Sequence, residues 1–166
     1  RSCWRLCPTG SATGCASLPK GDGSSWQCTF SDEFDGSVLN AAKWVVQTTA
    51  KSGFHSGPEC FVNTPSNVAV GGGTLRLTAR KEAAPFTCSS TSGSYSTQYT
   101  SGMVMTYGLF SQAYGRFEVR AKLPAAKGKG LQESFWLWPD NPYKYGTAWP
   151  LSGEIDIAEI YHQYPD

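Results

Sequence analysis

The stretch Gly153–Tyr161 constrains the chemistry and the local fold of this chain more than any other. It places three carboxylates, those of Glu154, Asp156 and Glu159, within six residues and separates them by aliphatic side chains. Side chains of a β-strand point alternately to its two faces. Read as a strand, the stretch therefore puts Glu154 and Asp156 on one face and the isoleucines that follow each of them on the other.

Strict alternation fails near the end of this strand, where it would put Glu159 on the isoleucine face and Ile160 on the acidic face. A β-bulge inserts one extra residue into a strand and so reverses the facing of the residues beyond it. One bulge near Ala158 returns Glu159 to the other acids and Ile160 to the apolar face. Because a single slip corrects both residues, the sequence predicts a bulge here, and bulges are found next to active sites.

Three acids on one face of a sheet repel one another, so the arrangement needs a reason. One interpretation is a solvated strand face without chemistry. The other is a glycosidase pair, since retaining glycosidases hold a nucleophilic carboxylate and an acid/base carboxyl about 5–5.5 Å apart. Glu154 and Glu159 are long enough to converge on one bond, and the charge of Asp156 between them can give the two groups different proton affinities. We favour the glycosidase interpretation.

The composition limits the partners of the chain. Its 166 residues, 40% of them hydrophobic, supply enough apolar surface for one core. The net charge is +1 and no basic patch stands out, so we expect no nucleic-acid partner. The longest apolar runs are only a few residues long, so we expect no membrane span. A high aromatic content with little charge suits stacking on a neutral ligand, although aromatic side chains also fill cores.

Six cysteines in a chain rich in Gly, Ser and Thr indicate disulfides, an oxidising compartment and hence a secreted protein. Six cysteines allow fifteen pairings. We prefer a bridge between Cys60 and Cys88, which leaves four cysteines for the N-terminal segment. A zinc site is the weaker alternative, because His55 and His162 are the only histidines and no Cys-x-x-Cys pair occurs.

The chain divides at about residue 28. Residues 1–27 show no periodicity and predict an irregular, disulfide-stapled lead-in, with a small carbohydrate-binding knot as the alternative. Residues 28–166 indicate one all-β sandwich without a convincing helix. Short strands are expected near residues 43–46, 59–62, 68–77, 99–110, 115–123, 134–138 and 154–160, with a hairpin turn at Gly71–Gly73 and a polar loop over residues 83–98.

From residue 28 to the end, the chain resembles glycoside hydrolase family 16. The acidic stretch Gly153-Glu154-Ile155-Asp156-Ile157-Ala158-Glu159 is similar to the bulged signature of the laminarinase (endo-β-1,3-glucanase) branch and of its agarase and carrageenase relatives. Other matches follow in family order: Asp32-Glu33-Phe34-Asp35-Gly36, Lys43-Trp44, Asn67-Val68, Thr100-Ser101-Gly102, Tyr114–Pro124, Phe135-Trp136-Leu137 and Trp149-Pro150. Each match alone is modest, and their ordered combination is specific.

The resemblance implies a β-jelly-roll sandwich of two curved antiparallel sheets, with a β-glycan in the concave cleft. It implies a retaining endo-β-1,3-glucanase in which Glu154 is the nucleophile, Glu159 the general acid/base and Asp156 the assisting carboxylate. Trp149 matches a sugar-stacking tryptophan. No cofactor is expected, and a structural calcium is compatible with the family but is assigned to no residue.

Two further residues are candidates for substrate binding. Trp136 is predicted to lie on the face opposite Phe135 and Leu137, where it could meet a sugar, and core packing is the alternative. Asn67 is a weaker candidate for the cleft.

The chain departs from the family pattern in ways that leave the substrate open. Met103 stands where many laminarinases have an arginine. The segment Leu131-Gln132-Glu133-Ser134 replaces a common Trp-Pro-Ala, and Tyr161–Pro165 follows the second glutamate where many relatives soon have a glycine. Agarose, carrageenan or another β-glycan therefore remain alternative substrates.

Two other functions stay open. A non-catalytic glycan-binding module could share the fold, but such relatives typically lack one or both of the glutamates that are present here. An unrelated disulfide-rich sandwich could bind calcium through the acids, but these lie in a strand and not in a loop with convergent oxygens.

The place of the signature near the end of the chain leads to one more expectation. In the family, strands that flank and face the acidic strand follow the signature. We therefore expect residues 1–166 to be the N-terminal part of a larger catalytic domain, completed by further sequence or by a second chain, and not to fold stably or turn over substrate alone.

Overall fold

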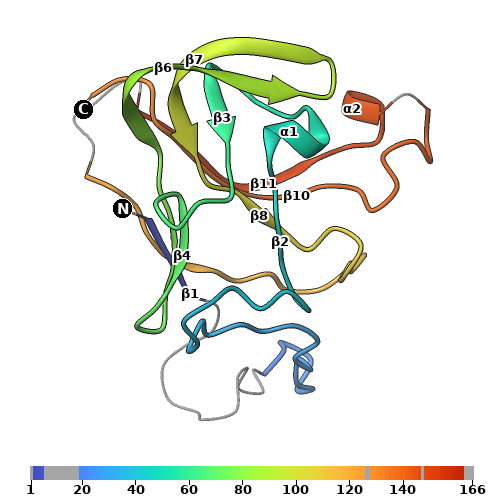
Figure 1. The fold of residues 1–166 in the computed structure, drawn as a ribbon. Coiled ribbons are helices and arrows are strands. Elements are labelled where there is room, and N and C mark those ends of the chain that lie inside the picture. The colour runs from blue at the N-terminus through green and yellow to red at the C-terminus, as the bar shows by residue number, and fades with distance from the viewer. Residues whose placement is uncertain (1, 6–18, 126–127, 147, 163–166) are drawn as a thin grey trace. The chain divides into compact units, whose positions relative to one another are not determined.

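The computed structural model describes residues 2–5, 19–125, 128–146 and 148–162, which form mainly short β-strands (Figure 1). The chain separates into two compact units, Arg1–Lys122 and Leu123–Asp166, and each is described by itself. The helical segments are α1 (Thr49–Ser52) and α2 (Ala148–Leu151). Among the described residues, no helix is long and apolar enough to cross a membrane.

The largest sheet of the first unit has the order β4-β5-β1-β9. It contains β1 (Ser2–Arg5), β4 (Val68–Val70), β5 (Leu75–Leu77) and β9 (Arg120–Lys122), and all neighbours are antiparallel. The prediction that residues 1–27 are irregular is therefore wrong for Ser2–Arg5. Four residues are too few to show a period, and β1 is held extended by the strands that pair with it on both sides.

The predicted hairpin at Gly71–Gly73 is confirmed. Val68 pairs with Leu77 and Val70 with Leu75, so β4 and β5 form an antiparallel hairpin. Gly72 and Gly73 both have positive φ angles, of 61° and 67°. Glycine adopts this left-handed region without the steric cost that a Cβ atom brings, which explains the glycines of the turn.

A second sheet has the order β3-β7-β6 and contains β3 (Glu59–Phe61), β6 (Arg80–Ser90) and β7 (Gly93–Ser101). The last two strands form a long hairpin, so the predicted polar loop over residues 83–98 is wrong. Most of the hairpin is not buried, so its many Ser, Thr and Tyr residues lack the apolar alternation that predicts a strand. The pair β3–β7 is parallel, an exception to the antiparallel sheets that the family resemblance implied.

The preferred disulfide between Cys60 and Cys88 is confirmed and joins β3 to β6. Both cysteines are buried. Cys28 is also disulfide-bonded, while Cys7 and Cys15 lie outside the described residues.

The core of the first unit gathers around Phe34, Val68 and Leu75. Partly buried side chains pack against these three: Leu39, Trp44, Val46, Val70, Leu77 and Val104. Two of them lie in the short antiparallel pair β2 (Val45–Val46) and β8 (Val104–Met105). These contacts make one apolar centre for the unit.

Asp32 connects the motif Asp32–Gly36 to the pair Lys43-Trp44 through hydrogen bonds beside this core. One of its carboxylate oxygens accepts a hydrogen bond from the indole nitrogen of Trp44 at 2.8 Å, and the other accepts one from the backbone nitrogen of Phe34 at 2.9 Å. Phe34 has a φ of 53°, which is uncommon for a residue with a side chain. The motif Asp32–Gly36 and the pair Lys43-Trp44 therefore have a structural role in the first unit.

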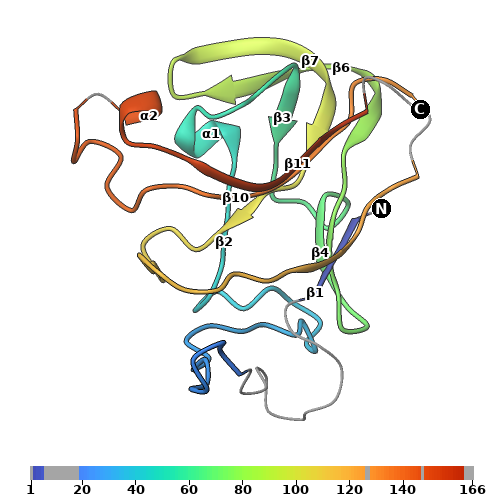
Figure 2. The ribbon, with the colours of Figure 1, turned by 180° about the vertical axis from the view of Figure 1, so that it is seen from behind.

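The described residues of the second unit form one antiparallel pair, β10 (Gln132–Leu137) and β11 (Ile155–Tyr161), which run side by side in both views (Figure 2). These strands match the predicted segments near 134–138 and 154–160. The predicted strand over 115–123 is shorter, because only Arg120–Lys122 is paired as β9.

The disulfide generates a prediction about stability. Cys60 and Cys88 are 28 residues apart, and a closed loop of that length restricts the unfolded chain by about 3–4 kcal/mol. The double variant Cys60→Ala/Cys88→Ala should lose about that much free energy of unfolding, measured by urea denaturation of the full-length gene product. An unchanged midpoint and slope would contradict this role.

Candidate active site

The bulge predicted near Ala158 is confirmed in the ladder between β10 and β11. Phe135 lies opposite Ala158, but the next residue, Trp136, lies opposite Asp156. Ile157 is therefore the extra residue of β11, directly before Ala158. The facing of every residue beyond it is reversed relative to strict alternation.

Residues directly opposite in an antiparallel pair place their side chains on one face. The register gives three such pairs on the acidic face: Gln132 with Tyr161, Ser134 with Glu159, and Trp136 with Asp156. Ile160 lies opposite Glu133 on the other face, as the bulge predicts. The structure thus brings Asp156 and Glu159 onto one surface with Trp136.

Glu154 precedes β11 and belongs to the same cluster of charges. Burial raises the pKa of its carboxyl, and the like charge of Asp156 adds to the rise, with a smaller contribution from Glu159. A hydrogen bond from the side chain of Trp149 acts in the opposite direction, because it favours the carboxylate. All three acids of the predicted site are therefore close enough to act on one another.

The two tryptophans differ in their surroundings. Trp149 lies in α2, where its φ and ψ of −68° and 141° are not helical, and it is 61% exposed. The side chain of Trp149 hydrogen-bonds Glu154, while most of the indole ring remains exposed to a ligand. Trp136 is half-buried and meets the ring of Trp138 edge to face, with 5.5 Å between the centroids. Its position on the acidic face agrees with the prediction, and binding of sugar by either ring stays a prediction.

Two residues that sequence reasoning did not assign to the site contact Glu159. The side-chain nitrogen of Gln132 donates to Oε1 of Glu159 at 2.7 Å, and the hydroxyl of Tyr161 donates to the same oxygen at 2.5 Å. Both residues lie in segments that depart from the family pattern. Their link to Glu159 depends on the pairing of β10 with β11, which the sequence does not state.

Another unforeseen pair lies beside these residues. Glu133 is buried, and its Oε2 lies 3.0 Å from Nε2 of His162. Both carboxylate oxygens of Glu133 and Nε2 of His162 are buried without a partner of hydrogen-bond geometry among the described residues. The backbone nitrogen of His162 donates to the carbonyl oxygen of Leu131 at 2.9 Å, which extends the ladder of β10 and β11 by one more hydrogen bond.

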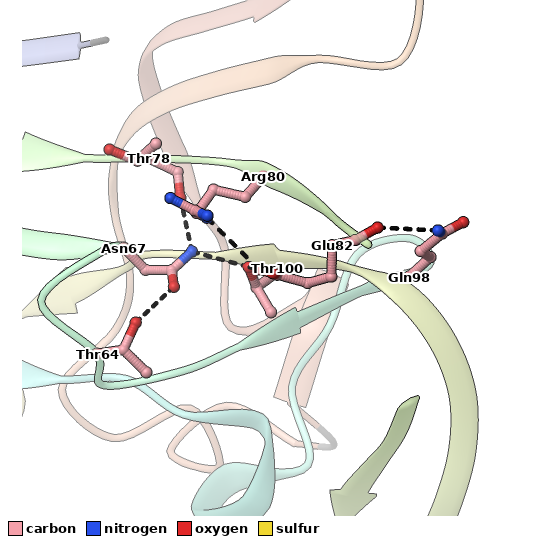
Figure 3. A network of polar contacts seen from close by, with 7 residues as sticks. All are labelled: Thr64, Asn67, Thr78, Arg80, Glu82, Gln98 and Thr100. Carbon is pink, nitrogen blue, oxygen red and sulfur yellow. Dashed lines mark hydrogen bonds and ion pairs between the residues drawn. The ribbon is translucent and has the colours of Figure 1, made fainter. Parts of the chain in front are cut away.

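Asn67 lies in the first unit, at the centre of a polar network (Figure 3). It is 2% exposed. Its Oδ1 accepts from the Thr64 hydroxyl at 2.7 Å, and its Nδ2 donates to the Thr78 carbonyl at 2.9 Å and to the Thr100 hydroxyl at 3.0 Å. These contacts use both ends of the amide. They favour a structural role, and its part in glycan binding stays a prediction.

The network continues from Thr100 and explains a second motif. The Thr100 hydroxyl donates to Glu82, which also lies 3.5 Å from Arg80 (Figure 3). The backbone of Asn67 approaches Gly102 so closely that a side chain at position 102 would collide with it. The motif Thr100-Ser101-Gly102 is therefore fixed by packing against the segment around Asn67.

Within the described ranges, no group of three or more His, Cys, Asp or Glu side chains is placed to hold a metal ion. We assign none of the described residues to calcium.

Comparison with known proteins covers most of the chain. The sequence profile described as glycosyl hydrolases family 16 matches residues 58–164. A β-glucanase from Rhodothermus marinus is 37% identical over 144 residues, which are 85% of this chain and 46% of that protein. The glucan endo-1,3-beta-glucosidase A1 of Niallia circulans is 34% identical over 148 residues, which are 84% of this chain and 20% of that protein.

Among solved structures, the X-ray structure of the laminarinase from Rhodothermus marinus matches with a TM-score of 0.68 and 34% sequence identity. The match covers 85% of this chain and 52% of that chain. The all-β, jelly-roll fold class predicted from the sequence is thereby confirmed. The chain spans about half the length of that structure and less than half of the two curated relatives.

The network around Asn67 generates a second prediction about stability. Asn67→Ala leaves a part-buried carbonyl and two threonine hydroxyls without this partner, so it should lower the free energy of unfolding by about 2–4 kcal/mol. Asn63→Ala, at an exposed asparagine four residues earlier, is the matched control and should change little. Unchanged stability with a raised KM for glycan would instead identify Asn67 as a ligand of the substrate.

Proposed function

Because this chain belongs to glycosyl hydrolase family 16, we propose that it carries the catalytic acids of a retaining endo-β-1,3-glucanase. One observation supports the proposal most strongly. The bulge at Ile157 places Asp156 and Glu159 on one face of β11, and Glu154 interacts with both. The three acids share a face only because β11 contains this extra residue, which favours a functional reason for the grouping.

The proposed reaction is a double displacement. The carboxylate of Glu154 attacks the anomeric carbon of the glucan while Glu159 gives its proton to the departing glycosidic oxygen. Water then attacks the same carbon, Glu159 takes a proton from the water, and the ester bond to Glu154 breaks. Two inversions at one carbon retain the β configuration, and no cofactor takes part.

Asp156 and Trp149 are proposed to shift the pKa of Glu154 in opposite directions. The charge of Asp156 disfavours the ionised form of the nucleophile, and the indole of Trp149 favours it. The exposed ring of Trp149 and the ring of Trp136 are proposed to stack on the apolar faces of sugars. A neutral glucan suits such a surface, because the chain is poor in charge.

The two β-glucan hydrolases that the chain resembles support β-1,3-glucan as the substrate, and the disulfides support a secreted protein. Two alternatives are tested alongside this proposal. One is a different β-glycan, and the other is a glycan-binding module without turnover.

A panel of laminarin, lichenan, agarose and carrageenan tests the proposed substrate. We expect the full-length gene product to release reducing sugars fastest from laminarin. Glu154→Gln, which removes the nucleophile but little shape, should lower kcat by about 10⁴-fold or more and leave binding largely intact. Faster release of reducing sugars from another glycan would identify that glycan as the substrate. Binding without release by the unaltered protein would favour the non-catalytic module.

Chemical rescue tests the roles of the two glutamates. Azide attacks a glycosyl-enzyme without help from a base, so Glu159→Ala with azide and an activated aryl β-glucoside should give a β-glycosyl azide. Glu154→Ala is the matched control and should give only the α-azide, by direct attack on the substrate. The reverse pattern would show that the roles are exchanged, and the products are distinguished by NMR.

The pH profile of kcat/KM tests the surroundings of Glu154. Since the nucleophile must be ionised, activity should rise with pH through the raised pKa of Glu154. Asp156→Asn removes a like charge and should move this acidic limb to lower pH. Trp149→Phe keeps an aromatic ring but removes a donor to the carboxylate, and it should move the limb to higher pH. Shifts in the same direction would contradict the assignment.

A further inference from the structure

The contacts of Glu159 are unequal between its two carboxylate oxygens. Oε1 accepts from Nε2 of Gln132 at 2.7 Å and from the hydroxyl of Tyr161 at 2.5 Å. Nε2 of Gln132 also lies 3.2 Å from the hydroxyl oxygen of Tyr161. The three side chains therefore gather on one side of the carboxylate.

The chemistry of the groups fixes the direction of each bond. An amide nitrogen only donates, and its two hydrogens diverge too widely to point at two acceptors 2.5 Å apart, so Gln132 gives one hydrogen to Glu159 and only approaches the oxygen of Tyr161. The same nitrogen also lies 3.5 Å from the hydroxyl oxygen of Ser134. Tyr161 directs its own proton at Glu159. A carboxylate oxygen has two lone pairs, and these two donors occupy both lone pairs of Oε1.

The strands supply these groups in the right place. Gln132 and Tyr161 are a directly opposed pair of β10 and β11, and Tyr161 lies two residues beyond Glu159 on the same face. One donor comes from each strand. This arrangement thus depends on the register that the bulge sets.

We propose that Gln132 and Tyr161 are positioning residues that hold Glu159 through Oε1 and reserve Oε2 for proton transfer. The inference rests on the proposed function, since it deepens the role of Glu159 in that reaction. The terminal torsion of a glutamate is broad, and turning it would break both hydrogen bonds. The same oxygen therefore faces the substrate in both steps.

The effect is largest in the second step. In the second step Glu159 is the general base, so its Oε2 must lie within hydrogen-bond reach of the attacking water. In this step an O–H bond of water breaks and its proton goes to Oε2 of Glu159. The water oxygen bonds to the anomeric carbon as the bond from that carbon to Glu154 breaks.

The other titratable groups on this face are Glu154, Asp156 and Tyr161, and β10 contributes none there. The pKa of Tyr161 is raised, first because its hydroxyl donates to Glu159, and further by burial and by the charges of the three acids. Tyr161 therefore stays protonated, and remains a donor, throughout the pH range in which the carboxylates act.

The kinetic test uses Tyr161→Phe, Gln132→Met and the double variant of the full-length gene product. The substrate is a dinitrophenyl β-glycoside of a β-1,3-linked glucose disaccharide, whose leaving group needs no acid. We expect kcat, which then reports the attack of water, to fall about 10- to 100-fold in the double variant. We expect kcat/KM, which reports the first step, to stay within about 2-fold, and azide to restore kcat.

Tyr95→Phe is the matched control for loss of a hydroxyl. The Tyr95 hydroxyl donates to the carbonyl oxygen of Glu59 at 2.6 Å in the first unit. Its removal should lower stability without splitting kcat from kcat/KM and without azide rescue. Equal losses of kcat and kcat/KM in the Tyr161 and Gln132 variants would show a merely structural role, and no loss of either would show none. Both outcomes overturn the inference.

A second measurement does not depend on activity. NMR titration of ¹³C-labelled tyrosines should place the pKa of Tyr161 above its ordinary value and move it down in Glu159→Gln. An ordinary pKa for Tyr161, or a pKa that Glu159→Gln does not change, would show that Tyr161 does not contact Glu159. An unaltered protein that hydrolyses no glucan contradicts the proposed function and the catalytic part of the inference, while the titration still decides whether Tyr161 contacts Glu159.

Discussion

The extra residue at Ile157 is the constraint on which the candidate site depends. Without it, Glu159 would lie on the face of the isoleucines and not on the face of Asp156. With it, Glu159 lies opposite Ser134 and within reach of Gln132 and Tyr161. One slip in the ladder therefore sets both the grouping of the acids and the donors that hold one of them.

The two glutamates are placed in different surroundings by the same strand. Glu154 stands before β11, where burial and the charge of Asp156 oppose its ionisation and one indole donor favours it. Glu159 stands within the ladder, where two donors from two strands meet one oxygen. A pair of identical side chains thus acquires different hydrogen-bond partners, which is what two distinct catalytic roles require.

Sequence reasoning succeeded where local pattern carried the information. The facing conflict between Asp156 and Glu159 exposed the bulge, and the glycines after Val70 marked a hairpin. Sequence reasoning failed where the pairing between distant segments determines which residues form a strand. Ser2–Arg5 is a strand because β5 and β9 flank it, and the polar β6–β7 hairpin lacks the apolar alternation of a half-buried strand. Gln132 and Tyr161 became visible only once the register of β10 and β11 was known.

The raised pKa of Glu154 opposes the ionised form that a nucleophile needs, and the course of the reaction offsets this. The carboxylate is costly because burial and like charges oppose it. Forming the ester with the sugar removes that charge, so part of the cost is relieved as the bond forms. Glu159 then faces one charge fewer when it acts as the base, and its two donors hold the carboxylate in place. Destabilising one carboxylate and holding the other thus assist successive steps of a single reaction.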